Sequence, residues 1–153
     1  MESSIELPDE LYEELKRHCS RGDELADQGL HNEALDCYNA AWELIPEPKN
    51  NWNASTWVLA AIGDSCLAAG YLTSADEAFT YALTCPNGLG NPFVHISLGK
   101  IRFERGELDA AADELVRAYM GGGLEVFEGQ DPKYLNFLRT RAVVLPQQNG
   151  AVR

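Results

Sequence analysis

The stretch Gly29–Pro46, GLHNEALDCYNAAWELIP, decides the fold because its pattern occurs three times along the chain. A small residue is followed four positions later by a large apolar one, and three positions after that by a second small one. Three groups share this order: Ala34, Tyr38 and Ala41; Ala75, Phe79 and Ala82; Ala111, Leu115 and Ala118. An internal repeat has to be identified before single segments are interpreted, because it sets the whole architecture.

Two glycines seven residues apart precede each group, and the first lies twelve residues before the first alanine. The pairs are Gly22 and Gly29, Gly63 and Gly70, and Gly99 and Gly106. The second glycine of each pair is expected to end a first helix in the left-handed conformation. Three residues later, Asn32, Thr73 and Asp109 are expected to cap a second helix. Ser74 with Glu77 offers a capping box as an alternative register in the middle copy. The pattern predicts a row of stacked helical hairpins.

These residues resemble the pattern of tetratricopeptide-repeat (TPR) proteins, W-x2-L-G-x2-Y followed by A-x3-F, A and P. The resemblance covers about residues 15–123. The middle copy matches through Leu59, Ile62, Gly63, Cys66, Ala75, Phe79 and Ala82. In the third copy His95, Arg102 and Leu115 replace the expected aromatic residues. The resemblance implies an all-α fold, a superhelical stack of about three TPR helix-turn-helix hairpins with a C-terminal capping helix.

A single TPR domain is predicted over residues 1–145, followed by a flexible tail over 146–153. The repeats are placed at about 15–48, 56–89 and 92–123, and the capping helix at about 131–142. Asp131 is expected to be the N-cap of that last helix, with Pro132 in its first turn. Tyr134, Leu135 and Leu138 would then cover the third repeat. The first glycines of copies one and two are 41 residues apart, so the connection over 46–56 is lengthened and is expected to project as a candidate contact site.

The charge balance limits the classes of molecule that this protein is expected to bind. The 153 residues carry 12 Lys and Arg against 24 Asp and Glu, a formal net charge of −12. Such a field repels phosphate backbones and anionic lipid headgroups, so we expect no nucleic acid and no membrane as partner. A basic protein partner is favoured. The first residues lack the basic and apolar regions of a secretory signal, so a cytoplasmic location with reduced cysteines is expected.

The sequence does not support catalysis. It contains no GxSxG, no HExxH and no GxxxxGK[ST] motif, and its four cysteines form no CxxC pair. His18 and His95 share one repeat position and are interpreted as packing residues. We therefore expect no enzyme, no catalytic residue, no cofactor and no metal site.

Helical geometry predicts the binding surface. In TPR proteins the first helices of the hairpins line the ligand groove, and residues at steps of three, four and three form one stripe on each helix. The stripe comprises Lys16, Cys19, Asp23 and Ala26; Trp57, Ala60, Asp64 and Leu67; and Phe93, Ile96, Lys100 and Phe103. Packing against the capping helix is the alternative for Phe93 and Phe103. Trp52, in the long connection, is either a loop anchor or a second contact. The residues predicted to bind a partner are Lys16, Asp23, Asp27, Trp52, Trp57, Asp64, Lys100, Phe103, Glu104 and Glu107.

The predicted function is a protein-protein interaction module with Trp57 and Phe103 supplying burial and the acidic residues supplying charge. The small size, the acidity and the segment YMGGGLEVFEGQDPKYLNFL resemble small TPR immunity proteins encoded beside bacterial secreted toxins. That resemblance implies binding and neutralisation of a basic toxin, such as a nuclease effector. The alternative is a cytoplasmic TPR chaperone for a secretion substrate. A clamp for an acidic C-terminal peptide is disfavoured, because only Lys16, Lys100 and Arg102 lie near the groove.

Overall fold

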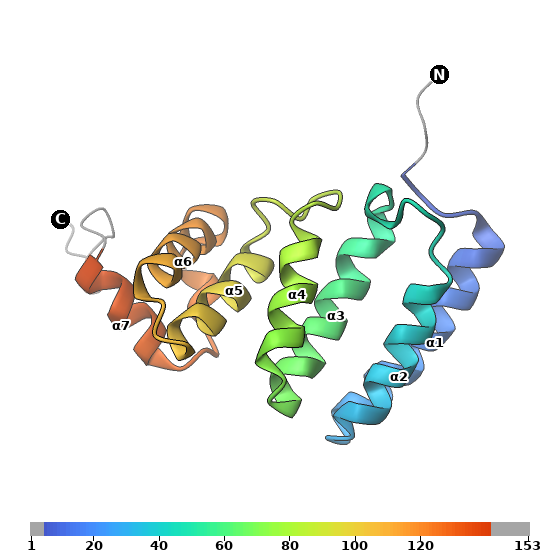
Figure 1. Ribbon diagram of the computed structural model, residues 1–153, viewed down its shortest axis with the longest axis horizontal. Helices are drawn as coiled ribbons and strands as arrows, with labels where there is room; N and C mark the ends of the chain where they lie inside the picture. Colours follow the sequence, from blue (N-terminus) through green and yellow to red (C-terminus); the bar gives the residue numbers. More distant parts are fainter. Residues whose placement is uncertain (1–4, 142–153) are drawn as a thin grey trace.

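The computed structural model describes residues 5–141, which fold into an array of α-helices. The helices stand side by side in chain order and give the described part of the chain an elongated shape, with the first and last helices at opposite ends of the array (Figure 1). Their bounds are α1 Asp9–Asp27, α2 His31–Glu43, α3 Asn53–Ala69, α4 Leu72–Ala82, α5 Pro92–Glu104, α6 Leu108–Gly122 and α7 Pro132–Arg141, with short 3-10 helices at Lys49–Asn51 and Gly123–Phe127. The predicted all-α hairpin stack is confirmed.

The repeated glycines and large apolar residues pair with each other inside the hairpins α1/α2, α3/α4 and α5/α6. A Cβ added at Gly63 would lie 2.5 Å from Cε2 of Phe79, which is fully buried. The other two hairpins repeat the arrangement, Gly22 against Tyr38 and Gly99 against Leu115. The glycine thus removes the side chain that would keep the two helices apart, and the ring or leucine of the second helix fills the space.

The second glycine of each pair ends its helix as predicted. Gly29, Gly70 and Gly106 have φ of 79°, 89° and 78°, in the left-handed region. At the middle turn the Tyr71 N–H donates to the Cys66 carbonyl (2.8 Å) and the Gly70 N–H to the Leu67 carbonyl (3.1 Å). These two bonds form a Schellman motif, which satisfies carbonyls at the end of the first helix.

The predicted N-caps of the second helices are wrong. The N-cap positions are Leu30, Tyr71 and Glu107, none with a side-chain capping bond, and Asn32, Thr73 and Asp109 are the second residues of their helices. The turn explains the difference. Tyr71 donates its N–H to the first helix while its carbonyl accepts from Ala75 (3.0 Å) in the second. One residue closes one helix and opens the next, so the turn is too short for a separate capping residue. The capping box at Ser74 is wrong for the same reason.

The last helix begins as predicted and covers the third hairpin. Oδ1 of Asp131 accepts from the Lys133 N–H (2.9 Å), and Pro132 is the first residue of α7. Tyr134 and Leu138 are buried in a cluster with Ile96, Leu115, Ala118 and Phe127, and Leu135 packs partly buried against it. The predicted tail over 146–153, and residue 142 of the predicted capping helix, lie outside the described residues.

The connection between α2 and α3 folds back instead of projecting. The Lys49 ammonium donates to the carbonyls of Trp42 and Ile45, each at 2.7 Å, at the end of α2. A cation is favoured there because the last carbonyls of a helix carry partial negative charge. The Trp52 indole N–H donates to the Pro46 carbonyl (2.9 Å). These bonds hold the connection against the hairpin.

Candidate binding cleft

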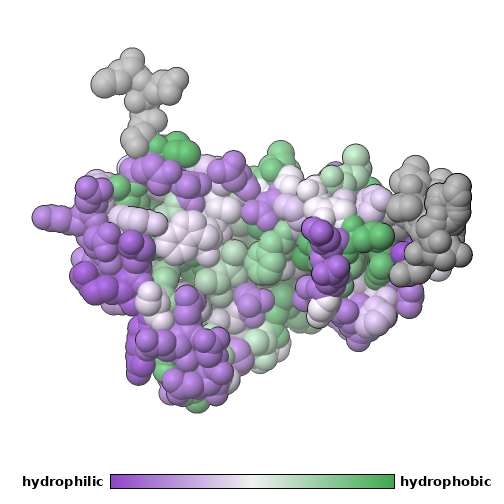
Figure 2. Space-filling view, turned by 180° about the vertical axis from the view of Figure 1, so that it is seen from behind, coloured by the Kyte–Doolittle hydropathy of each residue, from purple (hydrophilic) through white to green (hydrophobic). Residues whose placement is uncertain are grey.

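The surface of the array is uneven in polarity. Seen from behind, hydrophilic side chains cover much of the N-terminal end, whereas hydrophobic side chains gather towards the middle (Figure 2). Within residues 5–141, no helix is both long and apolar enough to cross a membrane. On this face, the apolar surface that a partner could bury therefore lies away from the N-terminal end.

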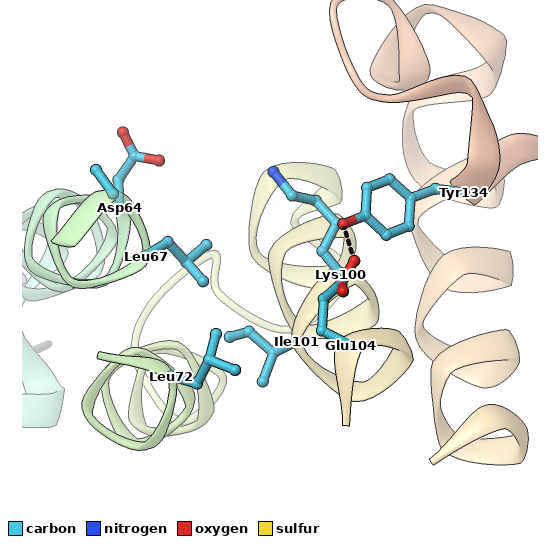
Figure 3. Close-up of a pocket in the computed structure, with 8 residues that line it drawn as sticks. Asp64, Leu67, Leu72, Lys100, Ile101, Glu104 and Tyr134 are labelled. Carbon is cyan, nitrogen blue, oxygen red and sulfur yellow. Dashed lines mark hydrogen bonds between the residues drawn. The ribbon is translucent and has the colours of Figure 1, made fainter. Parts of the chain in front are cut away.

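A cleft of about 400 Å³ opens between α3, α5 and α7 (Figure 3). Its apolar wall is formed by Leu67 and Ala68 from α3, Leu72 from α4 and Ile101 from α5. Leu67, Leu72 and Ile101 point towards one another in Figure 3, below the polar groups. The polar lining residues are Asp64, Lys100, Glu104 and Tyr134. The predicted stripe residues Asp64, Leu67 and Lys100 thus meet in one place, joined by Glu104.

Two of the charged groups in the cleft are already bonded within the chain. Oε2 of Glu104 accepts from the Tyr134 hydroxyl (2.7 Å) and lies 2.8 Å from the Lys133 ammonium. The hydrogen bonds from Lys133 and Tyr134 lower the pKa of Glu104, because they stabilise its ionised form. The Lys100 ammonium donates to Oε1 of Gln130 (2.9 Å). Both side chains are therefore held in place by the C-terminal segment.

Asp64 is different, because its exposed carboxylate has no ion pair within residues 5–141. It adds to the negative field around Tyr38, whose hydroxyl donates to Oδ1 of Asp23 (2.6 Å). Burial raises the pKa of Tyr38, and the Asp23 hydrogen bond and the charges of Asp23 and Asp64 raise it further. The negative charges of Asp23 and Asp64 therefore both act on Tyr38. Within residues 5–141, Asp64 is the carboxylate of the cleft without an ion pair, and Lys100, bonded to a neutral amide, is the cation without one.

The predicted residues nearer the N-terminus lie on α1 and the start of α3, outside the lining of this cleft. Lys16 pairs with Glu13 (3.3 Å), and its ammonium lies 4.7 Å from the centroid of the Tyr12 ring. Trp57 meets the same ring edge to face at 6.3 Å and is 37% exposed. Asp27 is exposed at the last position of α1. Trp57 therefore keeps free surface, although its ring is partly supported by α1.

Three sequence interpretations change with the structure. Phe103 packs under α7, its ring centroid 5.4 Å from that of Tyr134 and 5.2 Å from that of Phe137. Phe93 does not pack there, but meets the Phe79 ring at 6.0 Å and is 42% exposed. Two other stripe positions, Cys19 and Ile96, are buried among the helices. Only some of the stripe residues are therefore exposed for contact with a partner.

Glu107 and Trp52 also lie away from the cleft. Glu107 occupies the turn between α5 and α6, where its carboxylate is 3.9 Å from Arg102. Arg102 in turn reaches Asp76 and Glu114, on α4 and α6. Trp52 anchors the connection through its bond to Pro46, as one of the two alternatives proposed. Neither residue shares a lining surface with Asp64.

Sequence reasoning missed how the C-terminal segment completes the cleft. Tyr134 was predicted to cover the third repeat, but its hydroxyl also reaches Glu104, and Lys133 and Gln130 bind the charged groups of α5. The only signal was the Asp-Pro helix start at Asp131, which fixes the register of α7.

His95, one of the two histidines at the shared repeat position, is engaged in packing. His95 is buried, its Nε2 accepts the Gly90 N–H (2.9 Å), and its Nδ1 lies 2.7 Å from a Glu114 carboxylate oxygen. The proton must then be on Nδ1, so neither ring nitrogen is free for chemistry. Within the described part of the chain, no group of three His, Cys, Asp or Glu residues is placed to hold a metal ion.

Comparison with solved structures places this geometry in a known fold. The first TPR domain of the human RPAP3 protein is 19% identical, with a TM-score of 0.60, over 82% of this chain and 87% of that one. The first TPR of Spaghetti (RPAP3), solved bound to the HSP90 peptide SRMEEVD, is 19% identical with a TM-score of 0.61, over 82% and 90%. No family model and no curated protein matches the sequence. The chain has the fold of a tetratricopeptide-repeat domain.

Proposed function

We propose that this protein is a protein-binding domain whose cleft between α3, α5 and α7 takes a cationic, partly apolar segment of its partner. The exposed Asp64 carboxylate, which has no ion pair within residues 5–141 and lies beside an apolar wall, is the observation that supports the proposal. An incoming Lys or Arg would pair with Asp64, while its aliphatic stem or a neighbouring apolar residue contacts Leu67 and Leu72. The net charge of −12 favours the same class of partner.

The peptide bound by the Spaghetti domain has the opposite character. SRMEEVD carries three acidic side chains. Of the two ammonium groups beside this cleft, that of Lys133 is paired with Glu104, and that of Lys100 is bonded to the neutral amide of Gln130 and offers a single positive charge. Binding that peptide here would place its carboxylates beside Asp64 and Glu104. Like charges at close range disfavour association, so we expect SRMEEVD not to bind.

At a finer level, we propose that the partner is a basic toxin domain that this protein neutralises as an immunity protein in the cytoplasm. The acidic surface supports this proposal, because opposite charge accelerates association with a basic protein and can cover a phosphate-binding cleft. A secretion chaperone would use the same cleft, but it would hold an unfolded segment instead of a folded domain.

The test is a quantitative capture from lysate of the native organism with three tagged baits. These are the native protein, Asp64→Lys, and Asp113→Lys as a matched charge change on the exposed side of α6. We expect Asp64→Lys to retain at least about tenfold less of a basic partner, while Asp113→Lys retains it. The proposal is overturned if both variants lose the partner equally, or if neither does.

A second step identifies the partner class. One basic, folded partner whose toxicity this protein suppresses on co-expression supports the immunity proposal. Several unfolded secretion substrates contradict the immunity proposal and leave protein binding at Asp64 intact.

A further inference from the structure

A second groove of about 430 Å³ runs between α2 and α4, with α3 as its floor, and it is called the outer groove here. Figure 1 shows α3 between these two helices. Its lining includes Leu35 and Trp42 from α2, Cys66 from α3, Tyr71 from the turn before α4, and Glu77 and Tyr81 from α4. None of these residues lines the cleft beside Asp64, so the outer groove is a separate surface.

The equivalent space at the next junction, between α4 and α6, is occupied by an arginine of the chain itself. Arg102 extends from α5 so that its guanidinium lies 3.0 Å from Oδ1 of Asp76 on α4 and 3.8 Å from Oε2 of Glu114 on α6. Arg105 adds a second contact to Asp76, at 2.6 Å. Two acidic residues on neighbouring second helices thus hold a guanidinium between them.

Repeat positions show why the outer groove is open. Gly63 and Gly99 are 36 residues apart, and Ala34 and Ala75 are 41 apart. With these offsets, three residues of the outer groove correspond to the three members of the Arg102 network. Cys66 occupies the repeat position equivalent to Arg102, Ala78 the position equivalent to Glu114, and Leu35 the position equivalent to Asp76. A short thiol therefore replaces a long guanidinium side chain, and the space that Arg102 fills in one junction is left free in the other.

The rim of the outer groove suits a cation from outside. Trp42 and Tyr81 meet edge to face at 5.8 Å, and Tyr71 and Tyr81 are 45% and 37% exposed. Aromatic faces attract guanidinium groups, which also stack on them. The exposed carboxylate of Glu77 has no ion pair within residues 5–141. The Lys49 ammonium lies 5.1 Å from the Trp42 ring centroid, but it donates to two backbone carbonyls.

We propose that the outer groove binds an arginine side chain of a protein partner. The arginine stem lies against Leu35 on α2 and Cys66 on α3, and its guanidinium lies between the Tyr81 or Trp42 ring and the Glu77 carboxylate. The partner's arginine takes the space that the chain's own arginine takes at the next junction. This site is independent of the cleft beside Asp64, so either site can fail without the other.

The experiment uses the full chain and a short peptide with arginine between leucines. Its matched control is the same peptide with citrulline, which keeps the shape of arginine without the charge. Binding is followed by NMR through the indole N–H signals of the three tryptophans, of which Trp42 alone lines the outer groove. Glu77→Gln tests the carboxylate, which is exposed and therefore replaceable without loss of folding, and Asp64→Asn controls for the other cleft.

We expect the arginine peptide to shift the Trp42 signal, the citrulline peptide to bind about tenfold more weakly, and Glu77→Gln to weaken binding by a similar factor. Asp64→Asn should leave the Trp42 response unchanged. Equal binding of both peptides overturns the proposal, as does a response at Trp57 without one at Trp42. Loss of the Trp42 response in Asp64→Asn as fully as in Glu77→Gln would show non-specific attraction to the acidic surface, and would also overturn it.

Discussion

A methyl group added at Gly63 should destabilise the protein, although the same change stabilises most helices. The new Cβ would lie 2.5 to 2.9 Å from three carbons of the Phe79 ring. Phe79 is completely buried and cannot swing into solvent, so α3 and α4 have to separate or the ring has to leave its rotamer.

The magnitude follows from two opposing effects. Overpacking of a well-packed core costs about 1–3 kcal/mol, and three contacts under 3.0 Å place this substitution in the upper part of that range. Replacing glycine by alanine inside a helix contributes about 1 kcal/mol of stabilisation. The expected net loss is about 1–2 kcal/mol, which lowers Tm by roughly 3–6 °C for a chain of this size.

Urea unfolding followed by circular dichroism measures this difference for Gly63→Ala. Ala68→Gly, at an exposed position of the same helix, measures the helix-propensity effect without the Phe79 contact. A gain of stability in Gly63→Ala, close in size to the loss in Ala68→Gly, would refute the interpretation that this glycine is required for helix contact.

Three further predictions concern other parts of the fold. Gly106→Ala should lose about 1 kcal/mol in the same unfolding assay, because φ is 78° there and a side chain is strained in that conformation. Burial disfavours ionised Asp76, but hydrogen bonds from Thr80, Arg102 and Arg105 outweigh this effect and lower the pKa of Asp76. Ionised Asp76 therefore stabilises the fold above its ordinary pKa, and this stabilisation is lost as the pH falls through the folded-state pKa. Asp76→Asn should be less stable than the native protein at neutral pH and should lose less stability on acidification. Burial raises the pKa of Cys19 to about 11, so mass spectrometry should show slower alkylation by iodoacetamide at Cys19 than at half-buried Cys37, and equal rates in the folded protein would contradict this.

The repeated fold was predictable from sequence because its determinants are local and periodic. Gly63 with Phe79, and the equivalent pairs, recur at fixed spacing, and each records one close approach of two helices. The left-handed residue Gly70 was equally visible, since few residues other than glycine adopt that conformation. Asp131 with Pro132 marked the start of α7 for a similar reason.

The N-caps were not predictable from residue type alone. Asn32, Thr73 and Asp109 are good capping residues, but the turn uses a single residue to end one helix and begin the next. Backbone geometry therefore overrode side-chain preference. A sequence pattern does not reveal that competition.

The candidate site was predictable only in part. The stripe brought Asp64 and Lys100 to the same cleft, because helix periodicity fixes which residues share a face. It did not separate exposed positions from those covered by a neighbouring helix, so Cys19, Ile96 and Phe103 were included. Their burial depends on contacts between elements far apart in the sequence.

The most direct test of the account is site-specific photo-crosslinking from the cleft. A photoreactive phenylalanine is placed at Ala68, which lines the cleft and is exposed, and in a second bait at Asp113 on α6 as the control. The account predicts that the Ala68 bait crosslinks a protein partner in native lysate through a segment containing Lys or Arg, and that the Asp113 bait does not. The same crosslinked proteins at both positions, or an acidic segment at Ala68, would contradict it.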